Sequence, residues 1–169
     1  HGRDRRQRQM CIRDSSGGGS IISMMSTAKF YRCYVSSNLV APVSESAVTD
    51  GGTASGYTPG SGGGISVIRS ASLFLYDTSI KANKAFHGGG LYGDDQVLLE
   101  MLNSSVFFNE ALNSGGGVYG VENVSVILRN SLVNHNTAIN GIGGGLSITD
   151  KGSVKISESS VMSNTVLNL

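Results

Sequence analysis

The chain has 169 residues, of which 39% are hydrophobic, 15% are charged and 24 are glycine. A chain this apolar is not intrinsically disordered, and its glycines do not recur at every third residue as they do in collagen. The length is typical of one domain, and no apolar run reaches the ~18–20 residues that a membrane-spanning helix needs. We therefore expect a globular protein with no membrane span and no nucleic acid among its partners.

The charge is concentrated at the start of the chain. Residues 1–15 hold five of the 13 basic residues and two of the 12 acidic ones, so the remainder has a net charge of −2. One interpretation of this basic N-terminal segment is an arm that binds nucleic acid or membranes, and another is a flexible terminus. We favour a third interpretation, because "QMCIRDS" resembles the translated adapter peptide that often begins proteins from raw transcript assemblies. Residues 1–15 are predicted to be disordered or non-native, with the true N-terminus missing.

From residue 16 onwards the chain consists of a repeat. The triplet Gly-Gly-Gly occurs five times, and 21 residues after its first glycine stands an asparagine that is followed two residues later by Ala or Val. The first glycines are Gly17, Gly62, Gly88, Gly115 and Gly143, and the asparagines are Asn38, Asn83, Asn109, Asn136 and Asn164. From Gly62 onwards, successive triplets lie 26 to 28 residues apart.

The positions between these marks alternate with a period of two, which is typical of β-strands and not of helices. The residues 11, 13 and 18 positions after the first glycine are apolar in almost every copy, and the residue at 16 is small. The small column consists of Cys33, Thr78, Ser104, Ser131 and Ser159. We expect it at a crowded inner corner.

A repeat of this length made of short strands predicts an all-β, right-handed parallel β-helix of about five coils, each with 26–28 residues and three strands. Stacked coils place like residues above one another at ~4.8 Å, so the asparagines would form a hydrogen-bonded ladder. The triple glycines would form a tight corner with positive φ and no colliding Cβ atoms. A leucine-rich repeat is the competing solenoid, but "SSVFFN" lacks its L-x-x-L-x-L pattern.

One insertion interrupts the period. The ladder asparagine and the next triplet are 24 residues apart in the first copy and only five to seven residues apart in the later copies. We predict a projecting loop at residues 41–61, either a binding loop or a flexible bulge. Residues 16–169 would then be a single β-helix domain and a fragment of a longer array, because neither end offers a polar cap.

The repeat resembles a known family. "IKANKAFHGGGLY" (80–92) and "VFFNEALNSGGGVY" (106–119) are similar to the repeats of chlamydial polymorphic membrane proteins and of pectate-lyase-like β-helix proteins. The resemblance implies a secreted or surface-displayed adhesin, although this chain has Gly where Ala is usual at the third glycine. Polysaccharide cleavage by acidic clusters, sometimes with Ca²⁺, is the enzymatic activity that such a fold implies.

Two columns offer candidate sites. Asp95, Glu122 and Asp150 stand seven residues after the first glycine of three successive triplets. Stacking would place them ~5 Å apart, where they could share Ca²⁺ or act on a glycoside. We favour solvated turns for them, because they accompany Gly and Asn. Tyr92 and Tyr119 share a column that is either a glycan-contact platform or, as we prefer, a packing pair.

The leading functional hypothesis is a non-catalytic stalk or adhesin-like binding surface at the cell surface or outside the cell. Its expected partners are carbohydrate or a host or cell-surface protein, with further β-helix coils at both ends, and no cofactor beyond weakly bound Ca²⁺. The alternative is a polysaccharide lyase or glycoside hydrolase that uses the carboxylates above or coils outside this chain.

Overall fold

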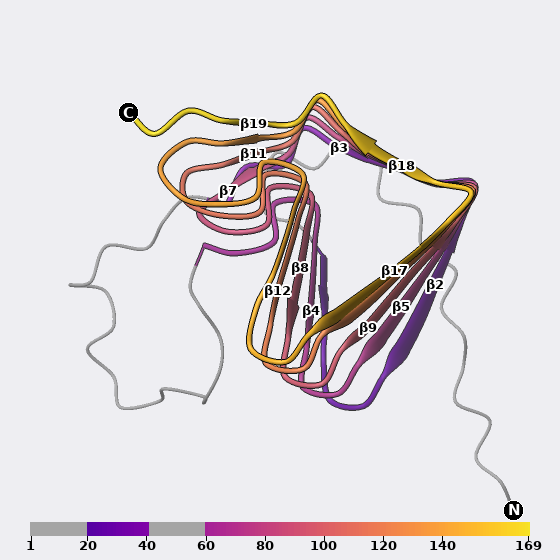
Figure 1. Ribbon diagram of the computed structural model, residues 1–169. Helices are drawn as coiled ribbons and strands as arrows, with labels where there is room; N and C mark the ends of the chain where they lie inside the picture. Colours follow the sequence, from indigo (N-terminus) through magenta and orange to yellow (C-terminus); the bar gives the residue numbers. More distant parts are fainter. Residues whose placement is uncertain (1–19, 41–59) are drawn as a thin grey trace, which may run out of the picture.

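The computed structural model describes residues 20–40 and 60–169 (Figure 1). Gly17, the N-terminal segment at 1–15 and nearly all of the predicted loop at 41–61 lie outside the described residues. The described residues form 19 β-strands and no helix, so none of them forms a helix that could cross a membrane.

The strands form four sheets, numbered here in chain order. Sheet 1 contains β1 (Ser20–Ile22), β4 (Ile65–Ile68), β8 (Leu91–Asp94), β12 (Val118–Val121) and β16 (Leu146–Ile148). Sheet 2 contains β2 (Thr27–Tyr31), β5 (Ser72–Tyr76), β9 (Leu98–Leu102), β13 (Ser125–Arg129) and β17 (Ser153–Ser157). Sheet 3 contains β3 (Tyr34–Ser36), β6 (Ser79–Lys81), β10 (Ser105–Phe107), β14 (Leu132–Asn134) and β18 (Ser160–Met162). Sheet 4 contains β7 (Lys84–Ala85), β11 (Glu110–Ala111), β15 (Thr137–Ala138) and β19 (Thr165–Val166).

Successive strands in the chain belong to different sheets, and every pairing within a sheet is parallel and joins neighbouring coils. In sheet 2, for example, Leu73 of β5 is in register with Leu99 of β9. The result is a parallel β-solenoid of about four turns, which confirms the predicted fold class. In Figure 1 the chain runs counter-clockwise from sheet 1 to sheets 2 and 3 as it advances from the indigo coil behind to the yellow coil in front, which is a right-handed winding.

The first described coil contributes three strands, β1 to β3, and each later coil adds a short strand in sheet 4 to the three that the sequence predicts. The residue before each ladder asparagine has a left-handed backbone, as at Phe108 (φ 53°) and His135 (φ 51°). This bend separates sheet 3 from the two-residue strands of sheet 4, which lie apart from the triangular body in Figure 1.

The core fills the triangle between sheets 1, 2 and 3. It consists of the inward columns that the period of two predicts, such as Leu75, Met101 and Leu128 in sheet 2, which are at most 1% exposed. Burial of these continuous apolar stripes supplies the main stabilisation of the fold.

The glycine corners connect sheet 4 to sheet 1, and a different constraint requires glycine at each of the three positions of the triplet. The first adopts positive φ, as at Gly88 (φ 60°). A Cβ on the second, Gly89, would lie 2.5 Å from the carbonyl oxygens of Glu110 and Gly116. A Cβ on the third, Gly90, would lie 2.8 Å from the Cγ1 of Val106, so there is no room for the alanine that is usual in similar repeats.

Candidate functional site

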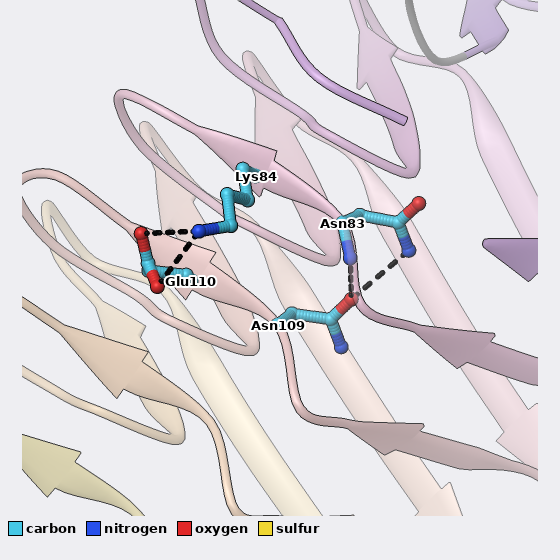
Figure 2. A network of polar contacts seen from close by, with 4 residues as sticks. All are labelled: Asn83, Lys84, Asn109 and Glu110. Atoms are coloured by element: carbon cyan, nitrogen blue, oxygen red, sulfur yellow. Dashed lines mark hydrogen bonds and ion pairs between the residues drawn. The ribbon is translucent and has the colours of Figure 1, made fainter. Parts of the chain in front are cut away.

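The asparagine column forms a continuous hydrogen-bonded ladder. Asn83 donates from Nδ2 (2.9 Å) and from its backbone N–H (3.0 Å) to the Oδ1 of Asn109, as Figure 2 shows. Asn109 makes the same two bonds to Asn136, and its Nδ2 also donates to the carbonyl oxygen of Ile80 at 3.0 Å. The pattern begins with Asn38 and continues to Asn164. Four of these amides are buried, Asn164 is partly buried, and they bond to one another, so they fix the stacking of coils and are not available to a ligand.

A second ladder runs along the corner between sheets 2 and 3. The hydroxyl oxygen of Ser104 accepts the backbone N–H of Thr78 (3.1 Å), while its own O–H donates to the carbonyl oxygen of Leu102 (2.9 Å). The same two bonds recur at Ser131 and Ser159. The sequence places this column at a crowded inner corner, and small size alone does not reveal that its members are hydrogen-bonded from coil to coil.

The acidic column lies in the turns that join sheet 1 to sheet 2. Asp95, Glu122 and Asp150 all have left-handed backbones in the turn between sheets 1 and 2, and Glu122 and Asp150 are exposed. Asp95 accepts a hydrogen bond from the neighbouring side chain of Gln96 at 3.2 Å. Over residues 20–40 and 60–169, no group of three or more His, Cys, Asp or Glu side chains is placed to hold a metal ion. The geometry is that of turn residues.

The tyrosine column is a stack of rings in which Tyr92 is buried and Tyr119 is partly buried. Tyr92 and Tyr119 stack with ring centroids 5.9 Å apart and an interplanar angle of 17°, and His87 stacks on Tyr119 at 4.7 Å. Tyr92 is 0% exposed, which corrects the expectation of an outward ring that a ligand could contact. The glycine corner lies close above this column, since a Cβ on Gly115 would be only 2.6 Å from the Cβ of Tyr119.

Asp94 is an acidic residue that the sequence interpretation missed. It lies on the same outer side of β8 as Tyr92 and is 3% exposed. The hydroxyl of Tyr92 donates to its Oδ2 at 3.1 Å, whereas its Oδ1 is buried without a hydrogen-bond partner. Burial raises the pKa of Asp94 to about 6, and the nearby charges of Glu122 and Asp95 add to this. The alternation of side chains along a strand would have placed Asp94 on the same side as Tyr92, which stands two residues earlier.

A mixed aromatic and charged row covers the outer face of sheet 2. Alternation places Lys29, Tyr31, Phe74, Tyr76, Glu100 and Arg129 on this side, and we call these six residues the outer row. Tyr31 and Tyr76 stack with centroids 4.7 Å apart. Lys29 Nζ lies 5.9 Å from the ring centroid of Phe74, and Arg129 Nε is 3.3 Å from Glu100 Oε1. These contacts join neighbouring coils, so side chains of different types are held in one row.

A surface cavity of about 470 Å³ lies beside the turn between sheets 1 and 2, lined by Met24, Met25, Arg69, Ser70 and Asp95. It is open to solvent and contains no other acidic side chain among its lining residues. Its mixture of exposed methionines with one arginine and one aspartate indicates no particular chemistry.

The fold and the site together define a parallel β-solenoid repeat protein with two internal polar ladders and a mixed outer row on one sheet. Comparison of the chain with protein-family models, curated proteins and solved structures finds no match.

Proposed function

We propose that the chain is a non-catalytic β-helix segment, secreted or displayed at the cell surface, that acts as a stalk and as an adhesin-like binding surface. The similarity of its repeats to those of polymorphic membrane proteins and pectate-lyase-like proteins supports this proposal. The observation that carries it is the outer row on sheet 2, where aromatic rings, cations and a carboxylate occupy neighbouring coils.

The scaffold beneath the outer row is stiff. The three inner strands of sheet 2, β5, β9 and β13, are bonded to the coil before and the coil after them, and the edge strands β2 and β17 to one neighbouring coil each. The hydroxyl ladder fixes the adjacent corner through Thr78, Ser104 and Ser131. Side chains of the outer row are further restrained by contacts with each other. A surface that is ordered before binding loses less conformational entropy on association, which favours recognition of an extended partner.

The chemistry of the outer row suits carbohydrate or a polar protein surface. The rings of Tyr31 and Tyr76 stack, so one face of each ring is covered by the other and their edges border the row. Glu100 and Arg129 supply acceptors and donors beside them. A partner rich in hydroxyl groups, such as a glycan at a cell surface, would bond to these groups. The solenoid has a second mode of association, because its edge strands can pair with further β-helix coils.

The test is a binding assay of the whole chain against immobilised glycans and intact cells, with variants on two faces. Tyr76→Ala and Arg129→Ala alter the outer row, whereas Lys84→Ala alters an exposed ion pair with Glu110 on sheet 4 (Figure 2). We expect each outer-row variant to weaken binding by about 10-fold or more and Lys84→Ala to leave it unchanged. Equal binding by all variants would refute the assignment of the surface to sheet 2.

The enzymatic alternative is favoured by one observation, the pKa of Asp94 at about 6, which is in the range that a general acid needs. Its burial argues against it, because a substrate would have to reach a carboxyl group that is 3% exposed. Depolymerisation of acidic glycans, assayed with and without Ca²⁺, distinguishes the two. We expect no cleavage. Cleavage that is lost in Asp94→Asn, Asp95→Ala or Glu122→Ala would replace the binding proposal by the enzymatic one.

A further inference from the structure

Asp94 occupies a costly position. A carboxylate that is taken out of water needs several hydrogen bonds or a cation to compensate for its lost hydration. Asp94 has the Tyr92 hydroxyl at Oδ2 and no partner at Oδ1. Its register partners are Ile68 in β4 and Val121 in β12, which are both apolar. The site therefore suits a neutral carboxylic acid better than a carboxylate.

The charged and titratable groups around Asp94 also favour its neutral form. On its own strand lies Tyr92, whose hydroxyl donates to Oδ2, and the acidic Asp95 follows directly after the strand. A weaker backbone hydrogen bond from Asp95 and the one from Tyr92 lower the pKa of Asp94, but burial outweighs both. Tyr119 lies in β12 and Glu122 follows that strand; the negative charge of Glu122 disfavours a second negative charge nearby. Arg69 follows β4, and its backbone N–H is bonded to the carbonyl oxygen of Asp94. His87 packs on the ring of Tyr119, and burial lowers the pKa of its imidazole, so it remains neutral near pH 7.

Buried polar atoms without partners are concentrated on this outer side of sheet 1. The hydroxyl oxygens of Ser66 and Ser147 are both buried and unbonded, and they stand in the same column as Tyr92 and Tyr119. The Nδ1 of His87 is also buried without a partner. A face with this many unbonded polar groups opens at a lower free-energy cost than the ladder face of sheet 4, where the amides are fully bonded.

We propose that Asp94 is a pH-sensing group of the solenoid: the outer side of sheet 1 is closed while Asp94 is protonated and opens locally when Asp94 ionises, which exposes the ring of Tyr92. In the open state the carboxyl group returns to water and to its ordinary affinity for protons. Raising the pH from 4.5 to 7.5 therefore favours the open state, and the pKa of about 6 sets the range in which the change occurs. This device is independent of the partner that the outer row binds.

Hydrogen exchange of backbone amides, followed by NMR at pH 4.5 and 7.5 and corrected for intrinsic rates, tests the proposal. From the difference between a pKa of about 6 and the ordinary 3.8, we expect protection in β8 and β12 to fall by up to about 25-fold between the two pH values. Protection in β11, on sheet 4, serves as the internal reference and should change little.

Asp94→Asn removes the titrating group and should make protection in β8 independent of pH. Asp95→Asn is the matched control, because it removes the same charge one residue later on a partly exposed side chain. It should keep the pH dependence of the wild type, with a slightly lower midpoint, because the charge of Asp95 is one of the smaller causes that raise the pKa of Asp94. If Asp94→Asn does not fold, the titration of the Asp94 carboxyl carbon in the wild-type chain still decides. A midpoint near 4, or a pH dependence that survives in Asp94→Asn, would overturn the proposal.

Discussion

Gly90 and Asn109 pack against each other across one coil, so that a Cβ on Gly90 would lie 3.0 Å from the Nδ2 of Asn109. The same contact joins Gly117 to Asn136 and Gly145 to Asn164, with 2.9 and 2.6 Å for the corresponding distances. The fixed spacing between glycine triplet and asparagine in the sequence has its physical cause here. The ladder amide occupies the space that the missing side chain leaves.

Gly90→Ala tests this contact. The added methyl group would overlap the Cγ1 of Val106 and the carbonyl oxygen of Gly117 and press on the ladder amide. We expect a loss of about 2–3 kcal/mol in the free energy of unfolding, measured by urea denaturation. Gly93→Ala, three residues later in β8, is the control, because its Cβ would meet only side-chain atoms at 3.1 Å or more. Equal losses in the two variants would contradict the explanation.

Asn109→Leu tests the ladder. Leucine has a similar size, but it removes the acceptor that serves two N–H groups of Asn83 and leaves these donors buried. We expect a loss of about 3 kcal/mol or more in the free energy of unfolding, since each unsatisfied buried donor costs ~1–3 kcal/mol. Asn140→Leu alters an exposed asparagine in the corner that follows sheet 4 and should change stability by less than ~0.5 kcal/mol. A small effect of Asn109→Leu would show that the ladder is dispensable.

Ser104→Ala separates hydrogen bonding from size in the small column. Alanine fits the same crowded corner, but the backbone N–H of Thr78 loses its acceptor. We expect a loss of about 1–2 kcal/mol in chemical denaturation. The adjacent Ser105 points outward and bonds to the hydroxyl of Ser79, so Ser105→Ala should cost clearly less. If both substitutions are neutral, the column is selected for size alone.

Asp94 and His87 give opposite contributions to the pH dependence of stability. The pKa of Asp94 is raised to about 6, so its contribution to stability is present in acid and is lost as the pH rises through that value. Asp94→Asn should therefore stabilise the protein at pH 7.5 by up to about 3 kcal/mol and have much less effect at pH 4. Thermal unfolding over this pH range measures the difference, with Asp95→Asn as the reference. Stabilisation of equal size at both pH values would contradict the assigned pKa.

His87 has a lowered pKa because it is buried, so its contribution to stability is present above its ordinary value of 6.5 and is lost as the pH falls below it. His87→Phe preserves an aromatic ring next to Tyr119 and does not titrate. We expect the variant to lose less stability than the wild type when the pH is lowered from 7.5 to 5, as measured by thermal unfolding. Parallel pH profiles of wild type and variant would show that His87 does not contribute to the pH dependence of stability.

The features of this structure that recur with the same residue type could be predicted from the sequence, and those that recur or occur without a common residue type could not. The inward stripes, the stacked asparagines and the corner at Gly88 each follow from a column whose members stand above one another. The bend at Phe108 was missed, because a left-handed backbone at a bulky residue leaves no signature in residue type. It is this bend that divides each of the later coils among four sheets.

The candidate surface was missed for a related reason. Glu100 and Arg129, or Lys29 and Phe74, are partners of different chemical types, so they do not form a recognisable column in the sequence. Tyr92 and Tyr119 do form a column, and their stacking follows from it. Tyr92 is buried beside the glycine corner at Gly88 and the ring of Tyr119. The alternation of residues in the sequence predicts which side of the strand Tyr92 faces, but it does not predict these neighbours.

The ladder also bears on how such a protein can change in length. Each asparagine bonds only to its neighbours in the adjoining coils, so a coil can be gained or lost as a unit while the remaining rungs keep their partners. From Asn83 onwards, the segment between the ladder asparagine and the next glycine triplet lengthens by one residue from coil to coil, and the stacking tolerates this variation. Duplication and deletion of whole coils is therefore the evolutionary step that this architecture accommodates best, whereas a single inserted residue within a strand would turn its inward side chains to solvent.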